Sequence, residues 1–176
     1  LSKNIFAKLL ALRQIPLELK ARVKPNYISV ITMISSNLIG MSKYNEAMAI
    51  TKEGNELFPK DATLIYNLGH MYKCLGDYDT AIKYLLSALA KDKHHLDTYH
   101  ELINIYQDRN DRVNEMKYIR DGIKNVDNNE SLYNDLGLYY SHSNHILALS
   151  AFERALEIGK DNPVILAKKT IIAIIL

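Results

Sequence analysis

Six histidines and one cysteine are the residues of this 176-residue chain whose chemistry could build a metal site or a catalytic site. His94 and His95 are adjacent near the end of an expected helix, so their side chains diverge. His142 and His145 flank an expected turn. Neither pair has the ligand spacing of a zinc site, so we expect ordinary surface histidines.

A metal site between helices, a nucleophilic cysteine and a phosphate-binding loop are equally poorly supported. His70 and His100 could approach each other across neighbouring helices, but the spacing fixes no third ligand beside them. Cys74 could pair with a histidine as a nucleophile, yet we expect a small apolar filler instead. Gly69 and Gly76 lie in and just after a helix, which is not the setting of a phosphate loop. The sequence therefore predicts no metal, no cofactor, no catalytic residue and no enzyme.

The charge balance and the cysteine content indicate which class of partner and which cellular compartment are favoured. The chain has 22 Lys and Arg against 20 Asp and Glu, and this net charge of +2 is spread along the sequence. Such a balance argues against a nucleic-acid partner. A single cysteine cannot form an internal disulfide, which favours a reducing compartment, the cytoplasm included.

The apolar run at residues 164–176 is the segment that could suggest a membrane. It is short and is interrupted by Lys168 and Lys169, whereas a membrane-spanning helix needs about 20 residues. We expect a C-terminal capping helix or the start of a further repeat, and no membrane contact. The alternative of an anchor that continues into a longer protein stays open at this point.

Similar segments recur along the chain at a fixed spacing of about 34 residues, which indicates a repeat architecture. Leu68-Gly69 and Tyr72 recur as Leu136-Gly137 and Tyr140, at twice this spacing. Two further copies fill the same columns, one between these two and one before them, so four copies share one register. Their members are Ile31, Ile34, Ser35 and Leu38 in the first copy, and Tyr99, Leu102, Ile103 and Tyr106 in the third.

The second half of each copy repeats as well. Ala81, Leu85 and Ala88 are matched at positions 47, 51 and 54, at 115, 119 and 122, and one residue early at 148, 152 and 155. The early set predicts a single deletion in the turn near Ser143 and Asn144. Pro25 and Pro59 are also one period apart, so the segment before the first copy should end as that copy does.

Apolar residues step by three and four within each copy, which predicts two amphipathic helices joined by a short polar turn and no strand. Gly69 should lie where the two helices approach most closely, and Gly76 should take a left-handed conformation after the first helix. The predicted segments are N-terminal helices or a degenerate repeat at 1–27, helix pairs at 28–61, 62–95, 96–129 and 130–163, and the capping helix at 164–176.

The period, the order of small and aromatic residues and the closing proline resemble the tetratricopeptide repeat (TPR) over about residues 28–163. The resemblance implies an all-α fold, a right-handed solenoid or superhelix of stacked antiparallel helix pairs. Ile31 and Ile65 stand where two copies have an aromatic residue, and Glu115 replaces a small packing residue. The third copy should therefore pack less tightly than the others.

The resemblance also implies that the first helices line a concave groove, in which a peptide or a partner helix binds. Lys73 is the one base there against Asp97, Glu101, Asp108 and Asp135, so we expect a protein partner of basic or amide-rich character. A clamp for the acidic tail of heat-shock chaperones is not expected, because only Asn67 suits it. The expected groove residues are Tyr66, Asn67, His70, Lys73, His100, Glu101, Asn104, Gln107, Asp108 and Asn134.

Two functions of different kinds follow from these observations. The first is an interaction module, a scaffold or adaptor that binds another protein in the groove. The second is a non-catalytic region of a larger protein, such as a glycosyltransferase, a signalling protein or a secretion or assembly component, used for substrate docking or self-association. A catalytic domain contiguous with this segment would favour the second function, and natural termini at 1 and 176 the first.

Overall fold

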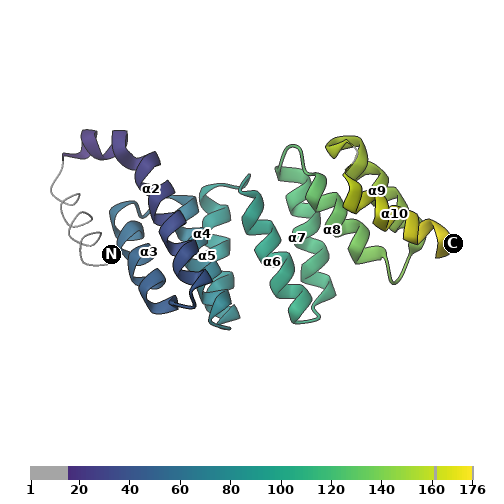
Figure 1. The fold of residues 1–176 in the computed structure, drawn as a ribbon, viewed down its shortest axis with the longest axis horizontal. Helices are drawn as coiled ribbons and strands as arrows, with labels where there is room; N and C mark the ends of the chain where they lie inside the picture. Colours follow the sequence, from purple (N-terminus) through teal and green to yellow (C-terminus); the bar gives the residue numbers. More distant parts are fainter. Residues whose placement is uncertain (1–15, 161, 176) are drawn as a thin grey trace. The chain divides into compact units, whose positions relative to one another are not determined.

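The described part of the chain, residues 16–160 and 162–175 of a computed structural model, consists of helices and turns and contains no strand. The predicted all-α helical-repeat fold is confirmed, while the start of the predicted segment 1–27 lies outside the described residues. The helices (Figure 1) are α2 (Leu17–Gly40), α3 (Tyr44–Leu57), α4 (Ala62–Cys74), α5 (Tyr78–Lys91), α6 (Leu96–Asp108), α7 (Arg112–Asn125), α8 (Glu130–Tyr140), α9 (His145–Gly159) and α10 (Pro163–Ile175).

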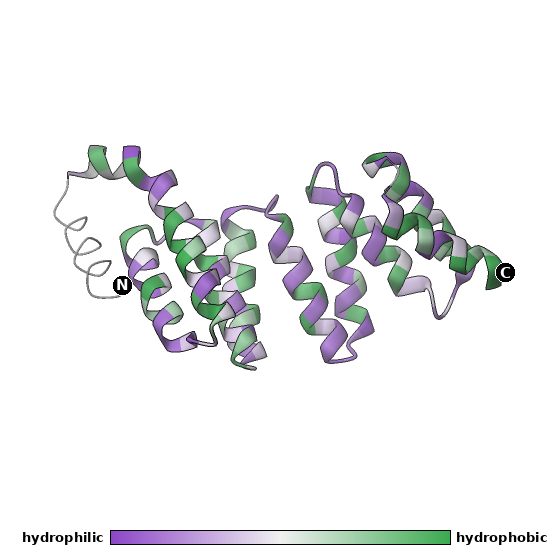
Figure 2. Cartoon of the chain, viewed as in Figure 1, coloured by the Kyte–Doolittle hydropathy of each residue, from purple (hydrophilic) through white to green (hydrophobic). Residues whose placement is uncertain are grey.

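The helices belong to two compact units, Leu1–Asp92 with α2 to α5 and Lys93–Leu176 with α6 to α10. Hydrophobic and hydrophilic residues alternate along most helices of both units (Figure 2), as amphipathic packing requires. In the first unit, one core cluster gathers around Ile31, Ile50 and Leu64 from three successive helices. Each helix thus buries its apolar face against its neighbours in the same unit.

Three hairpins turn between their helices in the same way. One residue of each turn has a left-handed backbone, namely Ser42 at φ 58°, Gly76 at φ 79° and Asn110 at φ 55°, and these three positions are equally spaced along the chain. The N–H of Gly76 donates to the carbonyl oxygen of Lys73 at 2.9 Å, which satisfies one carbonyl at the helix end. The predicted role of Gly76 is confirmed, and Ser42 and Asn110 adopt the same conformation at a steric cost that glycine avoids.

The fourth hairpin differs in its first helix. α8 has 11 residues where α4 and α6 have 13, and the turn at 141–144 is one residue longer than the turn at 75–77. Relative to the other hairpins, the loss of one residue thus combines a shorter α8 with a longer turn, and the prediction of a deletion in the turn near Ser143 stays a prediction. Asn144 is needed in the turn because its side chain accepts a hydrogen bond from the N–H of Leu147 at 3.1 Å and caps α9.

α2 does not end at Pro25 as the sequence predicts. It is one helix of 24 residues with Pro25 inside it, and Figure 1 shows this helix changing direction along its first half. A proline inside a helix removes one backbone hydrogen bond and bends the helix without ending it when the following turns are anchored. Tyr27 supplies that anchor, since its ring packs edge-on against the ring of Phe58, with the two ring centroids 5.5 Å apart.

Gly69 and Gly137 lie where the two helices of a hairpin approach most closely, as predicted. A Cβ atom at Gly69 would lie 2.9 Å from the side chain of Leu85, and one at Gly137 would overlap the ring of Phe152. In the first hairpin the same two columns hold Ser35 and Thr51, whose buried hydroxyls are hydrogen-bonded at 2.8 Å. Small residues thus face large ones, or two hydroxyls face each other.

The third hairpin packs less closely than the second and the fourth, but the first hairpin packs no more closely than the third, so the prediction that the third copy packs less tightly than all the others is not confirmed. Ile103 takes the glycine column and Glu115 takes the alanine column, and both are buried. α6 and α7 lie close together over less of their length than α4 and α5 do. A buried carboxylate in this place also requires polar partners, which are described below.

α10 packs on α9 through one apolar stripe. Ile165 and Ile172 are buried in a cluster with Ala148, Phe152 and Ala155. Figure 2 shows that hydrophobic residues dominate α10. Within residues 16–160 and 162–175, no helix has both the length and the apolar character that a bilayer crossing requires.

We expect Gly69→Leu to lower the free energy of unfolding by about 1–3 kcal/mol, because the new side chain would be forced against Leu85. Ala81→Leu should cost a similar amount, since Ala81 is fully buried. Gly40→Leu is the matched control, because nothing lies within 4 Å of a Cβ atom at Gly40. Urea unfolding measures the differences, and equal midpoints for all three variants would contradict this packing of α4 on α5.

Candidate functional site

The predicted groove residues of the first unit lie on α4. Tyr66, His70 and Lys73 are half-buried on successive turns, and the rings of Tyr66 and His70 stack with centroids 6.2 Å apart. Asn67 is buried, and its side-chain amide donates to the hydroxyl of Thr32 on α2 at 2.9 Å. The side chain of Asn67 therefore joins α4 to α2, whereas Tyr66, His70 and Lys73 contribute to the surface of α4.

Cys74 is exposed at the end of α4, so the prediction that it fills a gap in the core is wrong. Its sulfur lies 3.7 Å from Nε2 of His70. The helical spacing of four residues accounts for this proximity, because positions i and i+4 lie on one face. His94 and His95 make separate contacts instead, His94 with the carbonyl of Asn125 at the end of α7 and His95 with the nearby hydroxyl of Thr98.

Metal binding finds no support in the described residues. No group of three His, Cys, Asp or Glu side chains among residues 16–160 and 162–175 is placed to hold a metal ion.

In the second unit, His100 on α6 bridges to α8. Its Nδ1 lies 2.8 Å from a carboxylate oxygen of Asp135, and its Nε2 lies 2.9 Å from the hydroxyl of Ser131. The hydrogen bond to Asp135 is the main cause that raises the pKa of His100. Burial opposes this effect, while the charges of Asp135, Asp97 and Glu101 add to it. The site thus favours an imidazolium beside several carboxylates.

A third bridge repeats the pattern further along the same unit. The ammonium of Lys168 on α10 donates to the side-chain oxygen of Asn134 on α8 at 2.8 Å. Thr32–Asn67, His100–Asp135 and Asn134–Lys168 are separated by 35, 35 and 34 residues. Within each unit, successive first helices are therefore joined by a polar contact at the same place in the repeat.

The remaining predicted groove residues on α6 either lie on its open surface or turn toward α7. Asn104 and Asp108 are exposed on α6, whereas Glu101 is half-buried. Gln107 turns away from this surface, because its amide donates to Glu115 on α7 at 2.9 Å. The open part of the predicted site in this unit is thus centred on Asn104 and Asp108.

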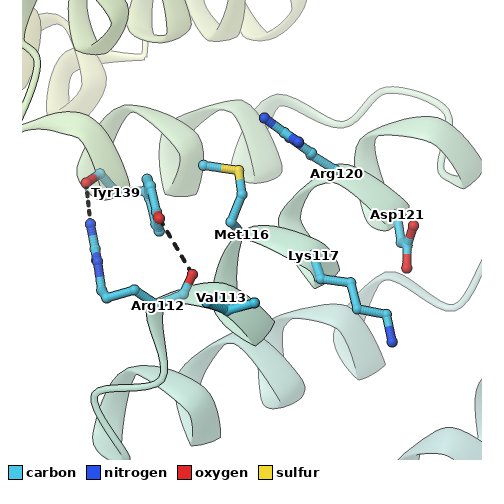
Figure 3. Close-up of a pocket in the computed structure, with 7 residues that line it drawn as sticks. All are labelled: Arg112, Val113, Met116, Lys117, Arg120, Asp121 and Tyr139. Atoms are coloured by element: carbon cyan, nitrogen blue, oxygen red, sulfur yellow. Dashed lines mark hydrogen bonds between the residues drawn. The ribbon is translucent and has the colours of Figure 1, made fainter.

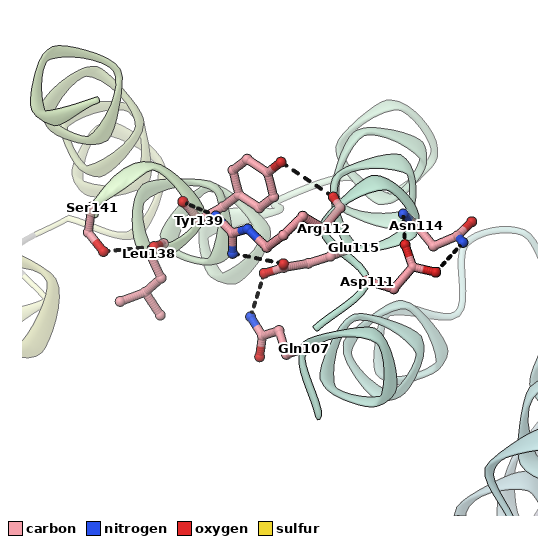
Figure 4. A network of polar contacts seen from close by, with 8 residues as sticks. All are labelled: Gln107, Asp111, Arg112, Asn114, Glu115, Leu138, Tyr139 and Ser141. Atoms are coloured by element: carbon pink, nitrogen blue, oxygen red, sulfur yellow. Dashed lines mark hydrogen bonds and ion pairs between the residues drawn. The ribbon is translucent and has the colours of Figure 1, made fainter. Parts of the chain in front are cut away.

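Sequence reasoning missed the network around the buried Glu115 (Figure 4). Besides Gln107, the guanidinium of Arg112 donates to its carboxylate at 2.9 Å. Arg112 also donates to the carbonyl of Tyr139 on α8 and stacks on that ring at 3.7 Å from the centroid. A carboxylate in a packing column, three residues after an arginine, was the signal that could have indicated this pair.

Comparison with known proteins finds tetratricopeptide-repeat proteins. A family model described as tetratricopeptide repeat matches residues 63–113. The human protein named tetratricopeptide repeat protein 7B is 27% identical over 128 residues, which are 72% of this chain and 15% of the human protein. The chain therefore spans a small part of the length of this relative.

Solved structures share the fold. TTC0263, a thermophilic TPR protein of Thermus thermophilus, is 13% identical, with a TM-score of 0.70 over 98% of this chain and 95% of that one. YrrB, described as a TPR protein with an unusual peptide-binding site, is 17% identical, with a TM-score of 0.58 over 87% of this chain and 80% of that one. Identities this low relate the folds and nothing more.

We expect the His100–Asp135 pair to make stability depend on pH. Because the folded-state pKa of His100 is raised above 6.5, the contribution of the pair is fully present below pH 6.5 and is lost as the pH rises through the raised pKa. The melting temperature of the native protein should therefore fall more over this rise than that of Asp135→Asn. An NMR titration of His100 checks the direction, and equal pH slopes in both proteins would contradict it.

Two variants that remove the same ion pair should differ in stability. Arg112→Ala leaves the carboxylate of Glu115 fully buried without its cation, at a cost of about 3 kcal/mol or more. Glu115→Ala should cost less, because it restores the alanine that other copies carry and leaves a half-exposed arginine that water can solvate. Chemical unfolding distinguishes the two, and equal losses would argue against a desolvated carboxylate at Glu115.

Proposed function

We propose that this chain, whose repeats match the tetratricopeptide-repeat model in part and share its fold, is a protein-interaction module whose first helices bind a peptide or a helix of another protein. Tetratricopeptide-repeat proteins are in general non-catalytic scaffolds for other proteins. The observation that carries the proposal is that each unit, taken by itself, has polar side chains on a first helix that packing does not require. They are Tyr66, His70 and Lys73 on α4, and Asn104 and Asp108 on α6.

The charges of the second unit favour a basic or amide-rich partner. Asp97, Glu101 and Asp135 all act on His100, and Asp108 lies exposed two turns further along the same helix. Even with an imidazolium at His100, carboxylates outnumber cations on this face. A lysine, an arginine or an amide of the partner would therefore meet complementary charge there, which speeds association and sets specificity.

Asn104 suits recognition of an extended peptide. Its exposed amide can both donate to a backbone carbonyl and accept from a backbone N–H, so it reads the main chain of a ligand rather than one side chain. The unusual peptide-binding site of YrrB supports peptide binding on this fold as a proposal for the present chain.

A second proposal is that this segment serves as the docking or self-association region of a larger protein. It is favoured by the human relative, of whose length the match covers 15%. Both proposals use the same first-helix residues, and they differ in whether the partner is recruited for an activity that lies elsewhere on one polypeptide.

The test is capture of partners from the native source with the full chain as bait. Replacing Tyr66, His70, His100 and Asn104 together by alanine should weaken capture by about tenfold or more, since these residues supply the aromatic and amide contacts. Because His100 also joins α6 to α8, the double variant His70→Ala/Asn104→Ala is measured in parallel and should show a smaller loss at unchanged stability.

The matched control carries four substitutions on second helices. Lys52, Lys83, Ser87 and Ser150 are exposed on α3, α5 and α9, and their replacement by alanine should leave capture unchanged. Capture that resists the groove variants but falls in this control would place the interface on the second helices and overturn the proposal.

A further inference from the structure

A pocket opens beside α7, on residues that the proposed first-helix surface does not include (Figure 3). Its volume is about 430 Å³, and six of its lining residues come from α7 and one from α8. The lining residues are Arg112, Val113, Met116, Lys117, Arg120, Asp121 and Tyr139.

One wall of this α7 pocket is held rigidly. The guanidinium of Arg112 lies flat on the ring of Tyr139, and the hydroxyl of Tyr139 donates to the carbonyl of Arg112 at 3.3 Å. Glu115 anchors the same guanidinium from the side of α7. These contacts of one arginine fix α7 against α8, so the wall is preorganised for a ligand.

Apolar side chains form the other part of the pocket lining. Val113 is 80% exposed, the largest value for any large hydrophobic residue among those described. Met116 beside it is half-buried, and Figure 3 shows its side chain between Tyr139 and Arg120. A valine left in water next to a pliable methionine offers a ligand an apolar contact.

The charge available to a ligand is positive. Glu115 neutralises Arg112, which leaves Lys117 and Arg120 opposed by Asp121. Lys124 extends the same face by one turn, and Val113, Lys117, Arg120 and Lys124 are all exposed. Within residues 16–160 and 162–175, no hydrogen bond or ion pair engages the side-chain nitrogens of Lys117, Arg120 or Lys124, and Lys117 meets only the ring of Tyr118.

The repeat itself does not require this stripe. The equivalent four positions one repeat earlier, on α5, are Asp79, Lys83, Leu86 and Ala90. The equivalent positions two repeats earlier, on α3, are Asn45, Ala49, Lys52 and Glu56, and those on α9 are Ile146, Ser150, Glu153 and Glu157. Since the fold is the same in all four hairpins, three cations beside an exposed valine are specific to α7 and are available for recognition.

We propose that the α7 pocket binds an acidic segment of a partner protein. Carboxylates of the segment pair with Lys117 and Arg120, and one of its apolar side chains packs on Val113 and Met116. The cations lie three residues apart on one helix face, which matches carboxylates spaced along a peptide. An isolated phosphate would use the cations but would leave the apolar lining in water, so the observations favour a peptide.

The test uses the full chain and two labelled hexapeptides, Glu-Glu-Leu-Glu-Glu-Leu and its uncharged counterpart Gln-Gln-Leu-Gln-Gln-Leu. Fluorescence anisotropy should show binding of the acidic peptide at least about tenfold tighter than that of the neutral one, with affinity falling as salt is added. Amide shift changes in NMR spectra should be confined to α7 and the end of α8.

Matched charge reversals localise the effect. Arg120→Glu should weaken the acidic peptide about tenfold, whereas Lys52→Glu, which reverses one exposed charge at the equivalent position of α3, should leave it unchanged. Val113→Asp should also weaken it, because it removes the apolar contact and adds a repelling charge.

Several outcomes would overturn the proposal. These are equal affinity for the two peptides, equal losses in Arg120→Glu and Lys52→Glu, and shift changes at α7 with inorganic phosphate or phosphatidylserine vesicles but not with the acidic peptide. The last result would assign the cations to a phosphate or a membrane surface instead.

Discussion

The close approach of the two helices in each hairpin is the contact on which the rest of the structure depends. A pair of amphipathic helices of 11 to 15 residues cannot bury its apolar faces alone, and it gains stability only when its neighbours cover them. Gly69 against Leu85, and Gly137 against Phe152, let the helix axes come close enough for the columns on either side to interlock. Packing at these columns fixes the rotation of every helix about its axis.

Once that rotation is fixed, equivalent positions of successive repeats also face each other. Polar contacts therefore recur at the same positions of the repeat. This is why Thr32–Asn67, His100–Asp135 and Asn134–Lys168 occur at one place in the repeat although their residue types differ. Each such hydrogen bond adds about 0.5–1.5 kcal/mol between neutral groups and about 1.5–3 kcal/mol where a charged group takes part. Their greater effect is to set the spacing of the first helices, and thereby the surface that a ligand meets.

A structural feature could be predicted from the sequence when it recurs from one copy of the repeat to the next. Helix pairs and the columns of small residues recur from one copy to the next, so comparison of the chain with itself found them, whereas the left-handed conformation of Gly76 was predicted from a glycine just after a helix end. Pro25, Cys74 and the shortened α8 occur once, and single residues gave no indication that a proline would stay inside a helix or that a cysteine would be exposed. Contacts of Arg112 with Tyr139 span 27 residues, outside both helical and repeat spacing.

The departures from the repeat are therefore where recognition should be sought. Glu115 stands in a packing column of α6 and α7, and its burial requires a cation, which Arg112 supplies. Arg112 can do so only by lying across the start of α7, where it meets Tyr139 and builds one wall of the α7 pocket. One non-repeating carboxylate thus positions the arginine that shapes one wall of a basic surface. Carboxylates gather on the first-helix side of the same unit, so its two faces differ in charge and would select different partners.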